Sequence, residues 1–89
     1  MKTPLDLTQA AIYDQLAEEA VELAHACQKM SRKLRGENPT PVTEDFIRHS
    51  VHEEFTDVIN TANYLGLAFD PDLAREKNRR WIERLNEQK

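Results

Sequence analysis

Apolar side chains in the first third of the chain recur every three or four residues, which is the spacing of one face of an α-helix. At about 100° per residue, a set of them falls within about one-sixth of a turn: Ile12, Leu16, Leu23, Cys27, Met30 and Leu34. Before this stripe, Thr3-Pro4 and Asp6-Leu7-Thr8 each offer a polar cap or a first-turn proline. Gly36 is a natural C-terminal stop. We therefore predict a long first helix, about 40 Å from end to end.

A second stripe with helical spacing follows a loop. Residues 36–42 contain one glycine and two prolines, which interrupt helices and favour loops. Thr43 is suited to cap a helix, and the two acids after it are favourable in a first turn. We expect this second helix to run to about Leu65 and to end at Gly66. Its apolar face is Ile47, Val51, Phe55, Val58, Ala62 and Leu65.

Asp70-Pro71-Asp72 marks a third helix start, with a polar cap, a proline at the first position and an acid in the first turn. This helix is expected to run to about Glu87, and Trp81 is expected to anchor an apolar core, with a platform for base stacking as the alternative. No segment alternates in the manner of a β-strand. The predicted fold is therefore all-α, with three main helices in a single domain of residues 1–89.

The size and charge of the chain restrict its partners. A chain of 89 residues buries a modest fraction of its surface. We therefore expect antiparallel helical hairpins to associate into a homo-oligomer, a dimer or tetramer with a four-helix-bundle core. The net charge of −4 argues against nucleic acid or anionic membrane as a partner, and no run approaches transmembrane length. Cys27 is the only cysteine, which points to the cytoplasm, and its spacing predicts core packing.

Each of the first two helices carries a cluster of acids, Glu-Glu-x-x-Glu and Glu-Glu-x-x-Asp, with no Lys or Arg inside. Residues three or four apart share one helical face, and several of these acids border the apolar stripes. Partly buried carboxylates repel one another unless a cation lies among them. Mg²⁺ prefers oxygen ligands of this kind, with Mn²⁺ as a substitute. The predicted metal ligands are Glu19, Glu22, Glu54 and Asp57, whereas either cluster alone also fits a solvated helix face.

The double motif resembles the signature of MazG-like nucleotide pyrophosphohydrolases, which belong to the all-α NTP pyrophosphatase superfamily. The resemblance covers roughly residues 10–85 and rests on the motif residues Glu18, Glu19, Glu22, Glu54 and Asp57. It implies magnesium-dependent hydrolysis of a nucleoside triphosphate to the monophosphate and pyrophosphate, in dimers or tetramers built from four-helix cores. One departure from the family pattern is the long interval between Glu22 and Glu54, which contains the proline-rich loop.

The chemistry assigns roles to the remaining polar residues. Magnesium bridges phosphate oxygens and orients an attacking water, so Glu18 and Glu19 are the predicted catalytic residues. Glu18 fits either a metal ligand or the group that orients or deprotonates the water. The basic residues at the end of the first helix, Lys29 among them, are explained by the helix dipole, with phosphate contact across a subunit interface as the alternative. The histidines, His25 among them, form no metal-ligand constellation.

Two further sets are predicted to bind substrate. Lys77, Arg80 and Arg84 form one basic stripe that suits the β- and γ-phosphates. The same stripe also fits a solvated face paired with neighbouring glutamates. Asn60 and Asn63 are predicted to read a base edge or the sugar, with a plain polar face as the alternative.

Two other functions fit the sequence. The first is a non-enzymatic helical module for oligomerisation or regulation, which would keep the fold but need no metal. The second is a phosphoribosyl-ATP pyrophosphatase-like activity, which would share the acidic site but need a different nucleoside pocket. Release of pyrophosphate from a nucleotide panel separates an enzyme from the non-enzymatic module, and direct comparison of substrates separates the two enzymatic activities.

Overall fold

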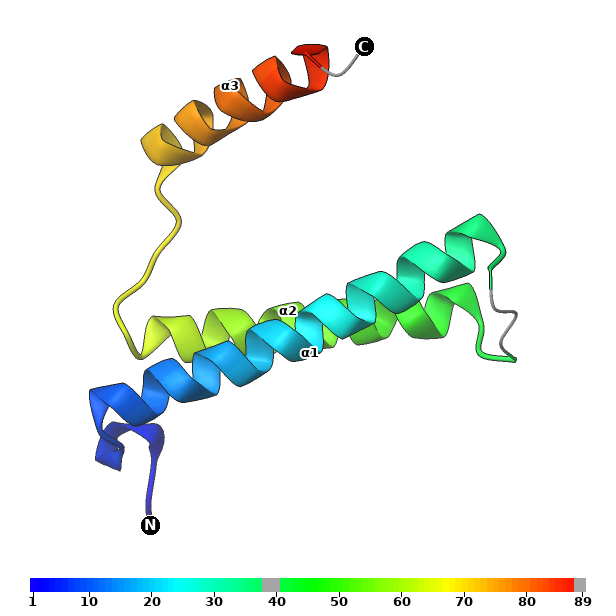
Figure 1. Ribbon diagram of the computed structural model, residues 1–89. Coiled ribbons are helices and arrows are strands. Elements are labelled where there is room, and N and C mark those ends of the chain that lie inside the picture. The colour runs from blue at the N-terminus through cyan, green and yellow to red at the C-terminus, as the bar shows by residue number, and fades with distance from the viewer. Residues whose placement is uncertain (38–40, 88–89) are drawn as a thin grey trace.

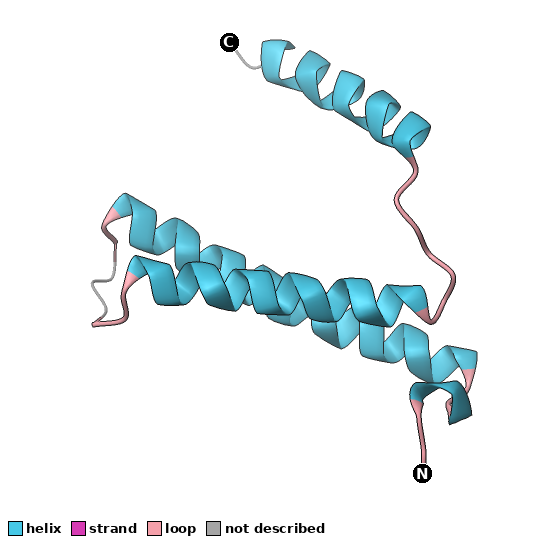
Figure 2. Ribbon diagram, turned by 180° about the vertical axis from the view of Figure 1, so that it is seen from behind, coloured by secondary structure: helices cyan, strands magenta, loops and turns pink. Residues whose placement is uncertain are grey.

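The computed structural model describes residues 1–37 and 41–87, and these residues form helices joined by turns and loops (Figures 1 and 2). A short 3₁₀ helix, η1 (Pro4–Asp6), precedes three α-helices. These are α1 (Gln9–Arg35), α2 (Glu44–Asn63) and α3 (Pro71–Glu87). The prediction of an all-α fold with three main helices is confirmed. Of the predicted loop 36–42, residues 38–40 lie outside the described residues.

Both predicted N-terminal start signals are used. Thr3 caps η1, with the Asp6 carboxylate accepting from the Thr3 backbone N–H at 2.7 Å. Thr8 caps α1, where its hydroxyl oxygen accepts from the Ala11 N–H at 3.1 Å. At the other end of α1, Gly36 takes a left-handed conformation with φ 72°, which a residue with a side chain rarely adopts. The long first helix therefore begins at the second signal and ends at the predicted glycine.

The second helix has the predicted cap and a slightly earlier end. The Thr43 hydroxyl oxygen accepts from the Phe46 N–H at 3.2 Å. α2 ends at Asn63, two residues before the predicted end, because the chain then turns. The N–H of Leu67 donates to the carbonyl of Ala62 at 3.1 Å, and Gly66 has φ 72°. This turn satisfies carbonyls that the end of the helix leaves unpaired.

The helices α1 and α2 lie side by side and antiparallel along most of their lengths, and they form the packed part of the described structure (Figures 1 and 2). Ile47 is almost completely buried, with 1% of its surface exposed, and Ile12 is 8% exposed. They belong to the two predicted stripes and lie toward opposite ends of the hairpin. Full burial of one such side chain contributes about 1.5–3 kcal/mol to folding. The predicted helical hairpin is therefore confirmed, with a thin core.

The third helix packs against neither of the others in the described chain (Figure 1). It begins where predicted, since the Asp70 carboxylate accepts from the Leu73 N–H at 3.1 Å. Trp81 is 57% exposed and Cys27 is exposed, so the predictions that they pack in a core are wrong for the single chain. The reason is that no second layer of helix covers their faces. Phe55, on the predicted α2 stripe, is 50% exposed for the same reason.

The overall dimensions also indicate that no second layer of helices covers the hairpin. The radius of gyration is 16.8 Å, whereas a compact domain of this length has about 12 Å. Many large apolar side chains are at least half exposed, on all three α-helices. None of the helices in residues 1–37 and 41–87 has the length and apolar composition needed to cross a membrane.

Candidate metal centre

Carboxylates from two helices meet near the middle of the hairpin. Glu19 of α1 and Glu54 and Asp57 of α2 each offer an oxygen atom, and these atoms lie within 4.8 Å of one another. Glu19 and Glu54 are half-buried, and Asp57 is exposed. The structure thus brings together three of the four predicted metal ligands, from segments more than thirty residues apart in the sequence.

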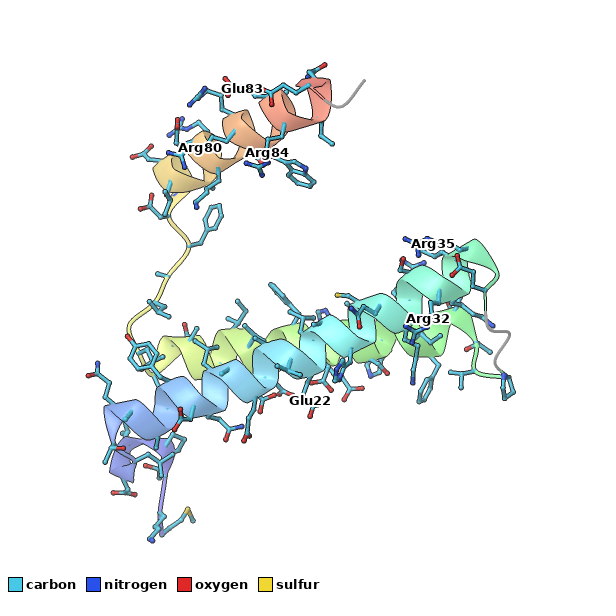
Figure 3. The ribbon with its side chains drawn as sticks, viewed as in Figure 1. Glu22, Arg32, Arg35, Arg80, Glu83 and Arg84 are labelled. Atoms are coloured by element: carbon cyan, nitrogen blue, oxygen red, sulfur yellow. The ribbon has the colours of Figure 1, made fainter. Side chains whose placement is uncertain are left out.

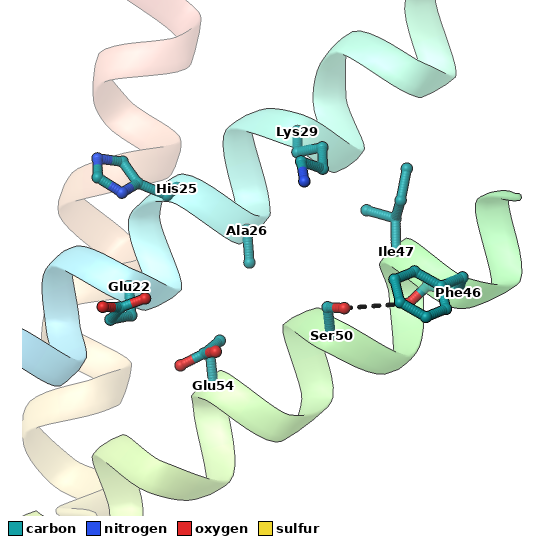
Figure 4. A pocket seen from close by; sticks show the side chains of 8 residues that line it. All are labelled: Glu22, His25, Ala26, Lys29, Phe46, Ile47, Ser50 and Glu54. Carbon is teal, nitrogen blue, oxygen red and sulfur yellow. Dashed lines mark hydrogen bonds between the residues drawn. The ribbon is translucent and has the colours of Figure 1, made fainter. Parts of the chain in front are cut away.

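Glu22, the fourth predicted ligand, lies beside Glu54. Both line a hollow of about 240 Å³ between α1 and α2, and their carboxylates face each other in Figure 4. Partial burial raises the pKa of Glu54 above its ordinary value of 4.5, and the negative charges of Glu22, Asp57 and Glu19 raise it further, in that order. Glu54 therefore lies in a field of several negative charges, and it forms no ion pair with Lys or Arg among residues 1–37 and 41–87.

The donor set fits a hard divalent cation. All four side chains offer carboxylate oxygens, and none of them is ion-paired with Lys or Arg in the described part of the chain. The Gln15 side-chain amide donates to the Glu19 carboxylate at 2.7 Å. A hydrogen bond of this kind orients a carboxylate that ligates a metal. Oxygen donors at short mutual distances suit Mg²⁺ or Mn²⁺ rather than a soft metal.

The two outer acids of the motifs differ from the inner ones. Glu53 is exposed and forms an ion pair with His49 at 3.0 Å between Oε1 and Nε2. It is therefore engaged on its own helix surface, although its negative charge makes the smallest contribution to the raised pKa of Glu54. Glu18 is exposed and lies one helical turn before Glu22, on the rim of the site. Its assignment as a catalytic residue remains a prediction.

The predicted phosphate-binding stripe on α3 is separate from the acidic cluster in the single chain. Figure 3 shows Arg80 and Arg84 on α3, apart from Glu22 on α1. Arg80 also donates to the Glu76 carboxylate at 3.3 Å, as the solvated-face alternative expects. Contact of Lys77, Arg80 and Arg84 with a phosphate at this cluster therefore requires α3 of another copy or a different placement of α3.

The two predicted asparagines line different hollows. Asn60 lines a hollow of about 360 Å³ together with Ile12 and Gln15 of α1. Asn63 lines a separate hollow along the last turns of α2 and the segment after it, among Phe55 and other apolar side chains. Because Gln15 is bonded to Glu19, the hollow with Asn60 adjoins the acidic cluster, and Asn60 is the better placed of the two for a substrate held there.

Two residues that were not predicted to belong to the acidic site also lie beside the acids. His25 and Lys29 line the hollow that contains Glu22 and Glu54 (Figure 4). The signal was present in the sequence, because Lys29 follows Glu22 by seven residues and His25 follows it by three, which places all three on one side of α1. The helix dipole explained Lys29 at the sequence level, and this explanation concealed its proximity to the acids.

The raised pKa of Glu54 predicts how the metal-free protein responds to pH. A carboxyl group with a higher pKa in the folded chain than in the unfolded chain binds its proton more tightly when folded. The free energy of unfolding should therefore fall as the pH rises from about the ordinary value of 4.5 through the raised value. Chemical denaturation with chelator present, followed from about pH 4 to 7, measures this decrease.

The matched control for the pH experiment is Glu54→Gln, which cannot ionise. This variant should lose a part of the pH dependence that wild type shows. Mg²⁺ should raise the stability of wild type most at the upper end of the range, because an ion that binds the folded state stabilises it. Superimposable pH profiles for the two proteins would show that Glu54 does not experience the neighbouring charges.

No family model, curated protein or solved structure matches the chain. The features of the chain that bear on its function are the acidic cluster, the two hollows that adjoin it and the motif resemblance.

Proposed function

We propose that the protein is a magnesium-dependent nucleoside triphosphate pyrophosphohydrolase of the MazG-like kind. The observation that supports this most is the approach of Glu19, Glu54 and Asp57 within 4.8 Å across the two-helix interface. Carboxylates held this close without a paired cation are costly, and a triphosphate brings magnesium with it. A purely structural hairpin would gain more stability from apolar residues at these positions.

Each residue of the cluster has a role in this proposal. Glu19, Glu22, Glu54 and Asp57 would hold Mg²⁺, which when bound neutralises phosphate charge and lowers the pKa of a coordinated water. The amide of Gln15 orients Glu19. Glu18, exposed on the rim, would orient the attacking water or accept its proton. Water oxygen bonds to the α-phosphorus, and pyrophosphate leaves.

The assembly that we propose is a homo-oligomer, a dimer or tetramer, in the cytoplasm. A second copy is the occupant that best fits the uncovered apolar faces, because the hairpin and α3 both expose large apolar side chains. Packing two hairpins would give the four-helix core, and α3 of one copy would then lie against another. In such an assembly Lys77, Arg80 and Arg84 would approach an acidic cluster.

The test is a panel of ribonucleoside and deoxyribonucleoside triphosphates incubated with the full chain and Mg²⁺. We expect release of pyrophosphate and a nucleoside monophosphate, with Mn²⁺ as a weaker or equal substitute and with no release in chelator. Phosphoribosyl-ATP belongs in the same panel, because it separates the histidine-synthesis type of activity from a general nucleotide activity. Release of orthophosphate in place of pyrophosphate, or no release from any substrate, would contradict the proposal.

A second candidate function is a non-enzymatic oligomerisation or regulatory module. The exposed apolar side of α3, with Trp81, Ile82 and Leu85 each more than half exposed, favours it. This candidate predicts association of chains that is independent of Mg²⁺ and no turnover. The partly buried acids of the hairpin have no role in it.

A further inference from the structure

Polar residues form a continuous line along one side of α1. Gln15, Glu22 and Lys29 follow one another at seven-residue steps, so each is turned by only about 20° from the one before it. Gln15 lines the hollow of about 360 Å³, whereas Glu22 and Lys29 line the hollow of about 240 Å³. The acidic cluster lies between these two hollows.

The opposing helix carries a matching line. Ser50 and Asp57 of α2 and Tyr64, the residue after its end, have the same seven-residue spacing. Ser50 lines the hollow that contains Lys29, and Tyr64 lines the hollow that contains Gln15. Because α1 and α2 are antiparallel, the two lines run beside each other from one hollow to the other, with the carboxylates between, and we refer to this strip of the hairpin surface as the groove. A ligand bound at the carboxylates therefore has two different directions in which to extend.

The two ends of this groove differ in charge. Residues 3–15 and 54–70, which surround the end with Gln15 and Tyr64, contain no Lys or Arg. The other end has Lys29, followed by the basic last turn of α1 with Arg32, Lys33 and Arg35. Lys29 takes part in no ion pair among the described residues. His25, about one helical turn before Lys29, lines the same hollow (Figure 4).

We infer that the groove binds a nucleoside triphosphate in one orientation, with the β- and γ-phosphates over His25 and Lys29 and the nucleoside toward Asn60 and Tyr64. This inference rests on the proposed function and adds to it the direction of the substrate. The hollow at the nucleoside end has Ile12 and Leu7 as apolar surface for the rings, and the amides of Gln15 and Asn60 at its border. Apolar walls with a few amide groups are typical of small-molecule sites.

This orientation gives Lys29 and His25 a part in the reaction. The water oxygen bonds to the α-phosphorus, and the bond from the α-phosphorus to the bridging oxygen breaks. Pyrophosphate keeps that bridging oxygen and its electron pair, so negative charge increases on the leaving group. Lys29 and His25 would donate hydrogen bonds to this charge, and charge-assisted bonds of this kind are the stronger ones.

The experiment measures binding of each half of the products separately, by calorimetry with Mg²⁺ present. The probes are inorganic pyrophosphate and the four deoxynucleoside monophosphates, each tested alone on the full chain. Lys29→Gln should weaken pyrophosphate binding about tenfold and leave monophosphate binding within about twofold. Asn60→Ala should weaken monophosphate binding about fivefold and leave pyrophosphate binding unchanged. Lys2→Gln makes the same charge change as Lys29→Gln outside the groove and should change neither.

Lys29→Gln and Asn60→Ala should each weaken the binding of a different probe, and this crossed pattern decides the orientation. Loss of monophosphate binding in Lys29→Gln with loss of pyrophosphate binding in Asn60→Ala would place the nucleoside at the other end, over Phe46, and overturn the inference. Equal effects on both probes, or no pyrophosphate binding by wild type, would also overturn it. Turnover of wild type on the nucleotide panel is measured in parallel. Hydrolysis without the crossed pattern refutes the orientation alone, whereas no hydrolysis refutes the proposed function.

Discussion

Glu54→Gln is expected to lower pyrophosphate release at least about a hundredfold, because loss even of a group that only supports a metal ligand costs about 10–100-fold. The carboxylate of Glu54 lies at the centre of the cluster, close to both Glu19 and Asp57. Glutamine keeps the size of the side chain and removes its charge, so the helix and its packing should persist. Steady-state rates on the best substrate of the panel, with circular dichroism for the fold, measure the effect.

The control for this variant is the adjacent residue. Glu53→Gln makes the identical change one position earlier, where the carboxylate pairs with His49 at the surface. Its rate should stay within about twofold of wild type, since exposed ion pairs contribute little. Asp57→Asn should behave as Glu54→Gln does. Similar rates for Glu53→Gln and Glu54→Gln would show that the cluster does not act as a metal site.

Trp81→Glu is expected to convert the assembled protein to a smaller species. Wild type should have a mass in solution of at least twice the 10.3 kDa of one chain, because a single chain leaves the apolar side of α3 uncovered. A buried, unpaired carboxylate at the centre of that contact costs several kcal/mol. Light scattering coupled to size-exclusion chromatography measures the change in mass.

A change of charge on the opposite side of α3 is the control for assembly. Glu87 follows Leu85 by two residues and Trp81 by six, which turns it by at least about 120° from both of them. Glu87→Lys should keep the wild-type mass. A wild-type protein that is monomeric at all concentrations would contradict the assembly. An unchanged mass for Trp81→Glu would show that Trp81 is outside the contact between copies.

Local signals predicted the helices well. Thr8, Thr43 and Asp70 cap the three α-helices as their side-chain chemistry requires, and Gly36 ends α1 with a positive φ. Each of these features depends on residues within one helical turn of each other, so it can be recognised directly in the sequence. The end of α2 was predicted two residues late because the turn at Tyr64–Gly66 continues the helical direction briefly.

Contacts between helices were predicted less well. The approach of Glu19 to Glu54 and Asp57 was predicted, because acids beside apolar stripes must lie close to the facing helix. The burial of Trp81 and Cys27 was predicted wrongly, since an apolar stripe shows that a face needs a partner and not which chain supplies it. Lys29 and His25 beside the acids were missed because the helix dipole already explained Lys29, although their spacing from Glu22 places all three on one side of α1.

Binding of Mn²⁺, followed by calorimetry on the full chain without nucleotide, tests the central claim most directly. Saturable binding at a defined number of ions per chain is expected for wild type and for Glu53→Gln, with strong weakening in Glu54→Gln and Asp57→Asn. Wild-type protein that binds no ion at millimolar concentration, or variants that bind as wild type does, would contradict the account.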